Sequence, residues 1–233
     1  MNIRILSIAL LFSFGGANLK GVNLAGANLT GAILKGNDLA GADLPKVNLT
    51  GANLTGAKLN GTILVEADLT GADLTGANLY GAQLGEAKLN KATLIEAILT
   101  GAKLEKAELA GATLNGADLQ EAHFVAAILT DADFSTKAGL KQTNLTRTNF
   151  TGAKLIDAKF IGAKLEETKF EKADLTKAFF NGAKFYRVYF YGADLKGADL
   201  TGTKQGDSQI PVTKEWLKSV GALNVDTIIG INN

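Results

Sequence analysis

Few residues of this chain could carry out chemistry, and they do not form a recognisable catalytic set. His123 is the only histidine; it directly precedes the apolar Phe124, and we expect its side chain to face solvent. Residues 206–208 read Gly-Asp-Ser, which resembles a hydrolase motif, but no histidine follows them to act as a base. The chain has no cysteine, no phosphate-binding loop, no dinucleotide fingerprint and no metalloprotease motif. We therefore expect no catalysis, no metal, no cofactor and no small-molecule substrate.

Residues typical of a binding surface gather towards the C-terminus. Tyrosine and arginine are enriched among the side chains that dominate binding energy at protein interfaces. We predict that this surface contacts a protein partner that the sequence does not identify. The alternative, which the sequence favours, is that the C-terminal tail folds back over the aromatic side chains. The aromatic part of the predicted surface, with its arginine, consists of Phe179, Tyr186, Arg187, Tyr189 and Tyr191.

The elements that must position these side chains follow from a repeat of five residues. Residues 69–84 read LTGADLTGANLYGAQL, with leucine at every fifth position. Neither an α-helix, with 3.6 residues per turn, nor a strand, with its period of two, would bury such leucines on one face. Counting centres from Leu19 gives 24 repeats to Phe134, and after a one-residue phase shift within residues 135–140, 13 more from Leu140 to Leu200.

Each repeat places a small and a large apolar residue two positions apart, so both point the same way in a short extended segment. Glycine is frequent two positions after the leucine, where the chain must turn. Successive repeats should therefore wind a coil around an apolar axis, with neighbouring coils hydrogen-bonded to each other. We expect Leu69, Leu74, Leu79 and Leu84 in the core, and only a small bulge at Ser135–Gly139 that does not project far.

The pattern A-(D/N)-L-x-G across residues 17–203 resembles the pentapeptide repeat family. The resemblance implies an all-β fold, a right-handed quadrilateral parallel β-helix with four repeats per coil and about nine coils. Lys164, Lys184 and Lys204 are twenty residues apart. On this fold they should stack about 5 Å apart as a basic stripe, and Lys164 and Lys184 complete the predicted partner surface.

Phenylalanine replaces leucine at alternate centres of the later repeats. On a four-sided coil, a spacing of ten residues places such rings on two opposite sides, so they should stack from coil to coil, with Phe185 interrupting the alternation. The predicted core phenylalanines are Phe150, Phe160, Phe170, Phe180 and Phe190.

Both ends of the chain depart from the repeat. Residues 1–16 contain the apolar stretch Ile5–Phe14, which either covers the first coil in a cytoplasmic protein or acts as a short signal-like segment in an exported one. Residues 204–233 form the predicted cap, with a short helix that Thr213 caps and Gly221 ends. We expect this cap to cover the last coil of a monomer, or to form a homodimer interface.

The net charge of the chain limits the classes of partner that it could bind. The net charge is +1, with −4 over residues 1–134 and +5 over residues 135–233. This balance argues against nucleic acid or an anionic membrane as a partner, and Ile5–Phe14 is too short to span a bilayer. The sequence thus predicts a non-enzymatic scaffold that binds protein. The family resemblance implies an alternative, a DNA mimic that binds DNA gyrase and protects it from quinolones, which the net charge disfavours.

Overall fold

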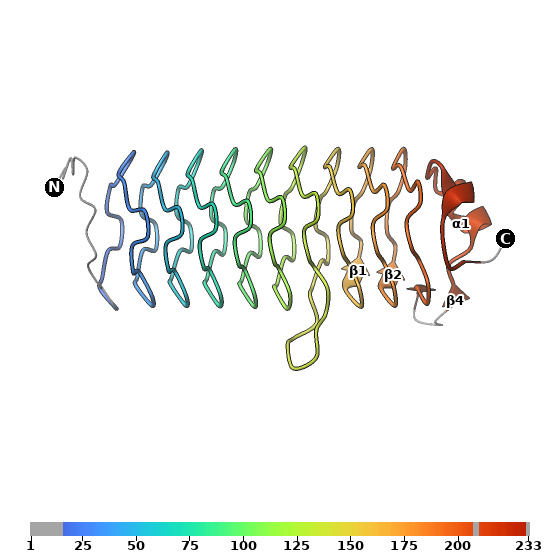
Figure 1. Ribbon diagram of the computed structural model, residues 1–233, viewed down its shortest axis with the longest axis horizontal. Helices are drawn as coiled ribbons and strands as arrows, with labels where there is room; N and C mark the ends of the chain where they lie inside the picture. Colours follow the sequence, from blue (N-terminus) through green and yellow to red (C-terminus); the bar gives the residue numbers. More distant parts are fainter. Residues whose placement is uncertain (1–15, 207–209, 232–233) are drawn as a thin grey trace.

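The computed structural model describes residues 16–206 and 210–231, and it shows a straight rod of stacked coils (Figure 1). The N-terminal and C-terminal parts of the described chain lie at opposite ends of the rod. The predicted cap or signal-like segment at residues 1–15 lies outside the described residues.

Parallel bridges link residues that are twenty positions apart, so one coil contains four five-residue repeats. Asp73, for example, pairs with Asn53 on one side and Thr93 on the other. Its N–H donates to the carbonyl of Ala52 at 2.9 Å, and the N–H of Leu74 donates to the carbonyl of Thr93 at 2.7 Å. Because each repeat hydrogen-bonds to the coils before and after it, the backbone is satisfied without any long strand.

The turns between the four sides require a positive φ at their third residue. In the turn that starts at Leu74, the N–H of Ala77 donates to the carbonyl of Leu74 at 2.9 Å, and Gly76 has φ 64°. Glycine adopts this backbone conformation without strain, which explains its place in the repeat.

Asparagine and aspartate also have a structural role that we did not anticipate. Just before the central leucine, their side-chain oxygen accepts a hydrogen bond from the N–H two residues later, as between Asp73 Oδ1 and Thr75 N at 2.9 Å. The same bond forms from Thr55 N to Asn53 Oδ1 at 3.0 Å. These bonds hold the chain at the point where each side of the coil begins to turn.

The interior of the rod is a continuous apolar core. Leu69, Leu74, Leu79 and Leu84, which make up one full coil, are completely buried. The alanines two residues before them are buried as well, because a larger side chain at that position would crowd the axis.

Phenylalanine rings form two stacked columns on opposite sides of the later coils. Phe150 stacks on Phe170 with ring centres 5.2 Å apart, and Phe160 stacks on Phe180 at 4.9 Å. The columns also meet edge to face across the axis, with Phe150 and Phe160 at 6.0 Å. Phe190 continues the first column, and Phe185 lies edge-on to Phe180.

The interruption after Phe134 is larger than the sequence indicated. Asp118 pairs with Asn144 and Asp133 with Lys159, so this coil contains 26 residues instead of 20. The repeat therefore resumes with Leu145, whereas Leu140 is only partly buried and lies outside the core. The prediction of a one-residue shift was wrong, and the extra residues form a loop that projects from the rod (Figure 1).

Four short strands form a sheet near the C-terminal end. β1 (Lys164–Glu166), β2 (Lys184–Tyr186) and β3 (Lys204–Gln205) are parallel, and β4 (Ile210–Pro211) pairs with β3 in the antiparallel direction. The antiparallel strand ends the series of parallel coils on this side of the rod.

The chain after β4 covers the last coil. Helix α1 (Lys214–Ser219) begins after Thr213, whose hydroxyl accepts a hydrogen bond from the N–H of Trp216 at 3.2 Å. Leu217 is fully buried, and a 3-10 helix, η1 (Val225–Thr227), follows. The tail thus closes the open end of the coil, which would otherwise expose apolar side chains and unpaired backbone groups. Within the described residues, no helix is both long and apolar enough to cross a bilayer.

Candidate binding surface

The three predicted lysines form one column, which we call the lysine column. Lys164, Lys184 and Lys204 are direct partners in the register of β1, β2 and β3. Adjacent strands are about 4.8 Å apart, so three ammonium groups project from equivalent positions on neighbouring coils. The coil register, rather than any local motif, positions this column.

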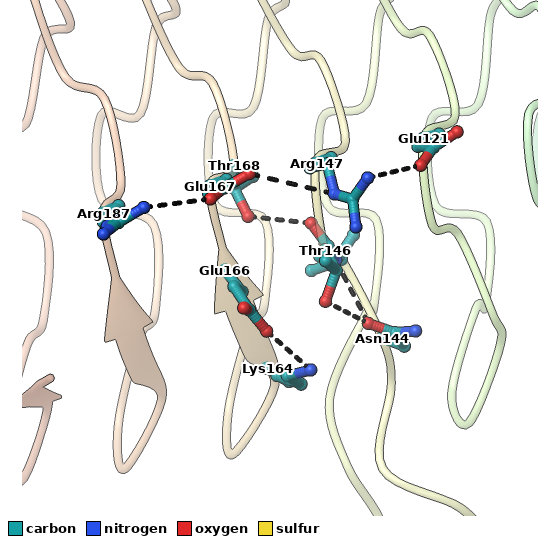
Figure 2. Close-up of polar contacts among 10 residues, drawn as sticks. Glu121, Asn144, Thr146, Arg147, Lys164, Glu166, Glu167, Thr168 and Arg187 are labelled. Atoms are coloured by element: carbon teal, nitrogen blue, oxygen red, sulfur yellow. Dashed lines mark hydrogen bonds and ion pairs between the residues drawn. The ribbon is translucent and has the colours of Figure 1, made fainter. Parts of the chain in front are cut away.

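A second charged column lies at the turn after this strand position in four successive coils, from Glu121 to Arg187, and we call it the turn column. The guanidinium of Arg147 contacts Glu121 at 2.9 Å and Glu167 at 3.8 Å, and Arg187 contacts Glu167 at 3.5 Å. The signs therefore alternate from coil to coil, as Figure 2 shows for these four side chains.

Glu166 connects the two columns electrostatically. Its carboxylate lies 2.8 Å from the ammonium of Lys164 (Figure 2). The hydrogen bond from Lys164 lowers the pKa of Glu166, and the positive charges of Lys164, Arg147 and Arg187 add to this effect. Glu166 is therefore ionised at neutral pH and neutralises part of the charge of the lysine column.

A groove of about 480 Å³ runs along the lysine column, and we call it the lysine groove. Polar and charged side chains form most of its walls. Gln142, which belongs to the projecting loop, closes one end and donates a hydrogen bond to the carbonyl of Gly162 at 2.8 Å. The lining residues are Gln142, Lys164, Glu166, Lys184, Tyr186, Lys204 and Gly206.

A second groove, of about 520 Å³, lies on the other side of Tyr186, and we call it the tyrosine groove. Trp216 and Val220 of the C-terminal cap form part of its wall. Tyr189 and Tyr191 also line it, with 44% and 69% of their surface exposed. The cap thus packs beside these tyrosines and leaves them accessible.

The cap covers a different set of aromatic rings. Trp216 lies over the last phenylalanines of the core, with ring centres 6.4 Å from Phe185 and 6.3 Å from Phe190. Gly221 lies so close to the ring of Tyr191 that a β-carbon there would come within 2.8 Å of it. The tail therefore closes the core and forms one wall of the tyrosine groove.

The structure brings most of the predicted surface residues together. Tyr186, Arg187, Tyr189 and Tyr191 all line the tyrosine groove, and the guanidinium of Arg187 lies 5.2 Å from the centre of the Tyr186 ring. Phe179 lies elsewhere. It pairs with Lys159 and Asp199 on the side of the coil opposite Tyr189 and is partly buried.

Comparison with known proteins identifies the family. A model of pentapeptide repeats matches residues 13–51, 52–90, 77–116, 107–135, 136–171 and 164–202. This chain belongs to the pentapeptide repeat family. Its fold is accordingly the right-handed β-helix of that family.

Several solved structures resemble this pentapeptide repeat protein. HetL, a protein involved in heterocyst differentiation regulation in the cyanobacterium Nostoc sp. strain PCC 7120, is 32% identical over 81% of this chain and 85% of its own, with a TM-score of 0.39. QnrB1, a plasmid-mediated fluoroquinolone resistance protein, is 19% identical in one trypsin-treated variant; the match covers 84% of this chain and 94% of that one, with a TM-score of 0.61. At 19% identity, the likeness to QnrB1 shows the fold alone. No curated protein matched in a separate search.

In the part of the chain that the structure describes, the side chains with potential for chemistry remain dispersed. The imidazole Nδ1 of His123 lies 3.6 Å from a carboxylate oxygen of Glu105, and both side chains are about half exposed. Across residues 16–206 and 210–231, no three acidic or histidine side chains lie close enough to hold a metal ion.

Sequence reasoning missed two parts of this surface. Trp216 belongs to a tail without any period, so nothing indicated which groove it would line. Gln142 lies in the insertion, for which the sequence predicted one extra residue and the structure shows six. Only the tyrosines, Arg187 and the lysines had a visible signal, which was their place in the repeat.

Proposed function

We propose that this pentapeptide repeat protein is a non-enzymatic scaffold that binds a protein partner through the tyrosine groove. The observation that carries the proposal is the exposure of Tyr189 and Tyr191 beside Trp216, Val220 and Arg187 at one end of a rigid rod. A tyrosine buries a large apolar area and keeps a hydroxyl for hydrogen bonding, at little cost in conformational entropy.

The chemistry of the groove indicates what such a partner presents. Tyrosine, tryptophan and valine side chains favour an apolar segment, while Glu171 and Arg187 provide charges of both signs at the same groove. A partner segment with an apolar centre and polar flanks fits this arrangement, as in many protein interfaces with an apolar core and a polar rim.

The DNA-mimic alternative has weaker support from the surface. Mimicry of a DNA duplex requires a strongly negative rod, whereas this chain has a net charge of +1 and carries the lysine column near its C-terminal end. We expect the purified protein neither to inhibit DNA gyrase supercoiling nor to protect the enzyme from a quinolone at micromolar concentration. Protection under these conditions would favour the alternative over the scaffold proposal.

Affinity purification from the source organism tests the scaffold proposal. The bait is the wild-type chain, a Tyr189→Ser/Tyr191→Ser double variant, or a Tyr80→Ser control that removes another strongly exposed tyrosine far along the rod. We expect one protein to bind the wild type and Tyr80→Ser at a fixed ratio but not the double variant. Equal recovery with all three baits would place the interaction elsewhere and contradict the proposal.

A further inference from the structure

The lysine column and the turn column share the coils of β1 and β2, but only the turn column alternates in sign. In the turn column, each arginine lies between or beside glutamates on neighbouring coils (Figure 2). In the lysine column, three positive charges follow one another without an acidic residue at the equivalent strand position. The repeat can thus pair opposite charges between coils, as it does at Glu167 and Arg187, three residues after Lys164 and Lys184.

Like charges at directly opposite positions of neighbouring strands repel each other and destabilise a sheet. Glu166 offsets this repulsion at Lys164, where the two side chains are 2.8 Å apart. Among the described residues, Lys184 in the middle of the column has no ion-pair contact. A bound anion would relieve the repulsion at Lys184.

The column also lies in a concave site rather than on a flat face. The lysine groove has a volume of about 480 Å³, which is within the range of roughly 300–1,000 Å³ common for small-molecule sites. Gln142 and Tyr186 add polar groups to its walls. The outer two lysines are separated by two strand spacings, about 10 Å, so a short linear ligand could contact all three.

We propose that the lysine groove binds a small polyvalent anion with two or three phosphate or carboxylate groups. The ammonium groups of Lys164, Lys184 and Lys204 would donate charge-assisted hydrogen bonds to successive anionic groups of the ligand. This site is separate from the proposed protein-binding function, because Tyr189 and Tyr191 line the other groove.

Isothermal titration calorimetry with sodium tripolyphosphate and with sodium citrate tests the proposal on the full chain. We expect at least one anion to bind with a 1:1 ratio, and the affinity to fall as sodium chloride is raised. Lys184→Gln should weaken binding at least tenfold. Lys196→Gln is the matched control, because it removes the same charge on the opposite side of the same coil, and we expect its affinity to stay within twofold of wild type.

Lys184→Glu separates binding from folding. This change creates an alternating column in which a carboxylate lies between two lysines, so we expect a higher melting temperature than wild type and no measurable binding. Tyr189→Ser/Tyr191→Ser should bind the anion as wild type does, whatever its effect on the protein partner.

The anion that binds identifies the charged groups that the lysine groove recognises. Binding of tripolyphosphate alone assigns the site to phosphate groups, and binding of citrate alone assigns it to carboxylates. Three results would overturn the proposal: no binding of either anion to wild type, equal weakening by Lys184→Gln and Lys196→Gln, or full binding by Lys184→Glu.

Discussion

At the scale of single residues, each position of the repeat answers one physical requirement. The central leucine fills the core, the alanine two residues earlier leaves room for it, and the asparagine or aspartate between them accepts a backbone hydrogen bond, as Asp73 does. The turn position requires positive φ, yet Glu66, Lys106 and other charged residues occupy it. Non-glycine residues carry a cost of roughly 1–2 kcal/mol in this conformation, and ion pairs between neighbouring coils, such as Lys106 with Glu86 at 3.1 Å, offset part of it.

Leu79→Ala should destabilise the rod by about 2–5 kcal/mol, because it leaves a cavity in a core that cannot collapse around it. Leu79 is completely buried. Urea unfolding gives the change in free energy. Tyr80→Ala, at the next and strongly exposed position, should change it by no more than about 0.5 kcal/mol. Similar losses for the two variants would contradict the inward placement of Leu79.

Acid should destabilise the rod through its aspartates. Burial opposes ionisation of Asp73, but hydrogen bonds from the hydroxyl and N–H of Thr75 and from the hydroxyl of Thr55 outweigh it and lower the pKa of Asp73. A carboxyl group with a lowered pKa stabilises the fold above its unfolded pKa of about 3.9, and this contribution is lost as the pH falls through the lower folded value. We expect the melting temperature to fall as the pH is lowered from about 5 to about 2.

Asp73→Asn provides the matched control for this pH dependence. Asn53 shows that asparagine accepts the same backbone hydrogen bond at the equivalent position, so the variant should fold and lose less stability in acid than wild type. An identical decrease in melting temperature for both proteins would rule out Asp73 as a contributor.

At the scale of elements, the repeat and its core could be predicted from the sequence, but the insertion could not. Insertions of one and of six residues leave all later repeats in the same phase of five, so periodicity cannot distinguish them. Ala138-Gly139-Leu140 also imitates a repeat, although Leu140 lies outside the core. Only the pairing of Asp118 with Asn144 shows that six residues form the loop.

Spacing within the repeat also decides which parts of the candidate site could be predicted from the sequence. The lysine column follows from spacing alone, because the repeats after Leu145 are uninterrupted. The predicted surface includes both Phe179 and Tyr189, but ten residues correspond to two sides of the coil and place Phe179 on the opposite face. The cap has no period, so the contact of Trp216 with Phe185 and Phe190 required the structure.

Deleting residues 137–142 and replacing Thr136 with glycine should restore an uninterrupted repeat. The glycine at position 136 would take the turn position and Thr143 the small inward position, so we expect a folded rod with cooperative unfolding. Circular dichroism and thermal unfolding provide the measurement. Failure of this variant to fold, while Thr136→Gly alone folds, would show that the loop itself is needed to hold the coils together. Leu140 and Lys141 of the loop pack against the Gly116 turn, where a β-carbon on Gly116 would lie 3.3 Å from each of them, and loss of this packing would explain such a result.

At the scale of the whole molecule, the repeats that stabilise the rod are distinct from the surfaces that we propose for binding. The core and the hydrogen bonds between coils repeat with little variation along its length, whereas the residues that line the tyrosine groove and the lysine groove all belong to the loop after Phe134, the last coils and the cap. The net charge differs between the two ends in the same way, with −4 over residues 1–134 and +5 over residues 135–233. A uniform scaffold that carries a distinct surface at one end is suited to presenting that surface to a partner.

The most direct test of this account is photo-crosslinking in cells of the source organism. A photoreactive phenylalanine analogue replaces either Tyr189 in the tyrosine groove or Tyr80, which is also strongly exposed but lies on the uniform part of the rod. If the tyrosine groove binds a partner, a discrete crosslinked protein forms from position 189 and none forms from position 80. Crosslinks of equal yield from both positions, or from position 80 alone, would contradict it.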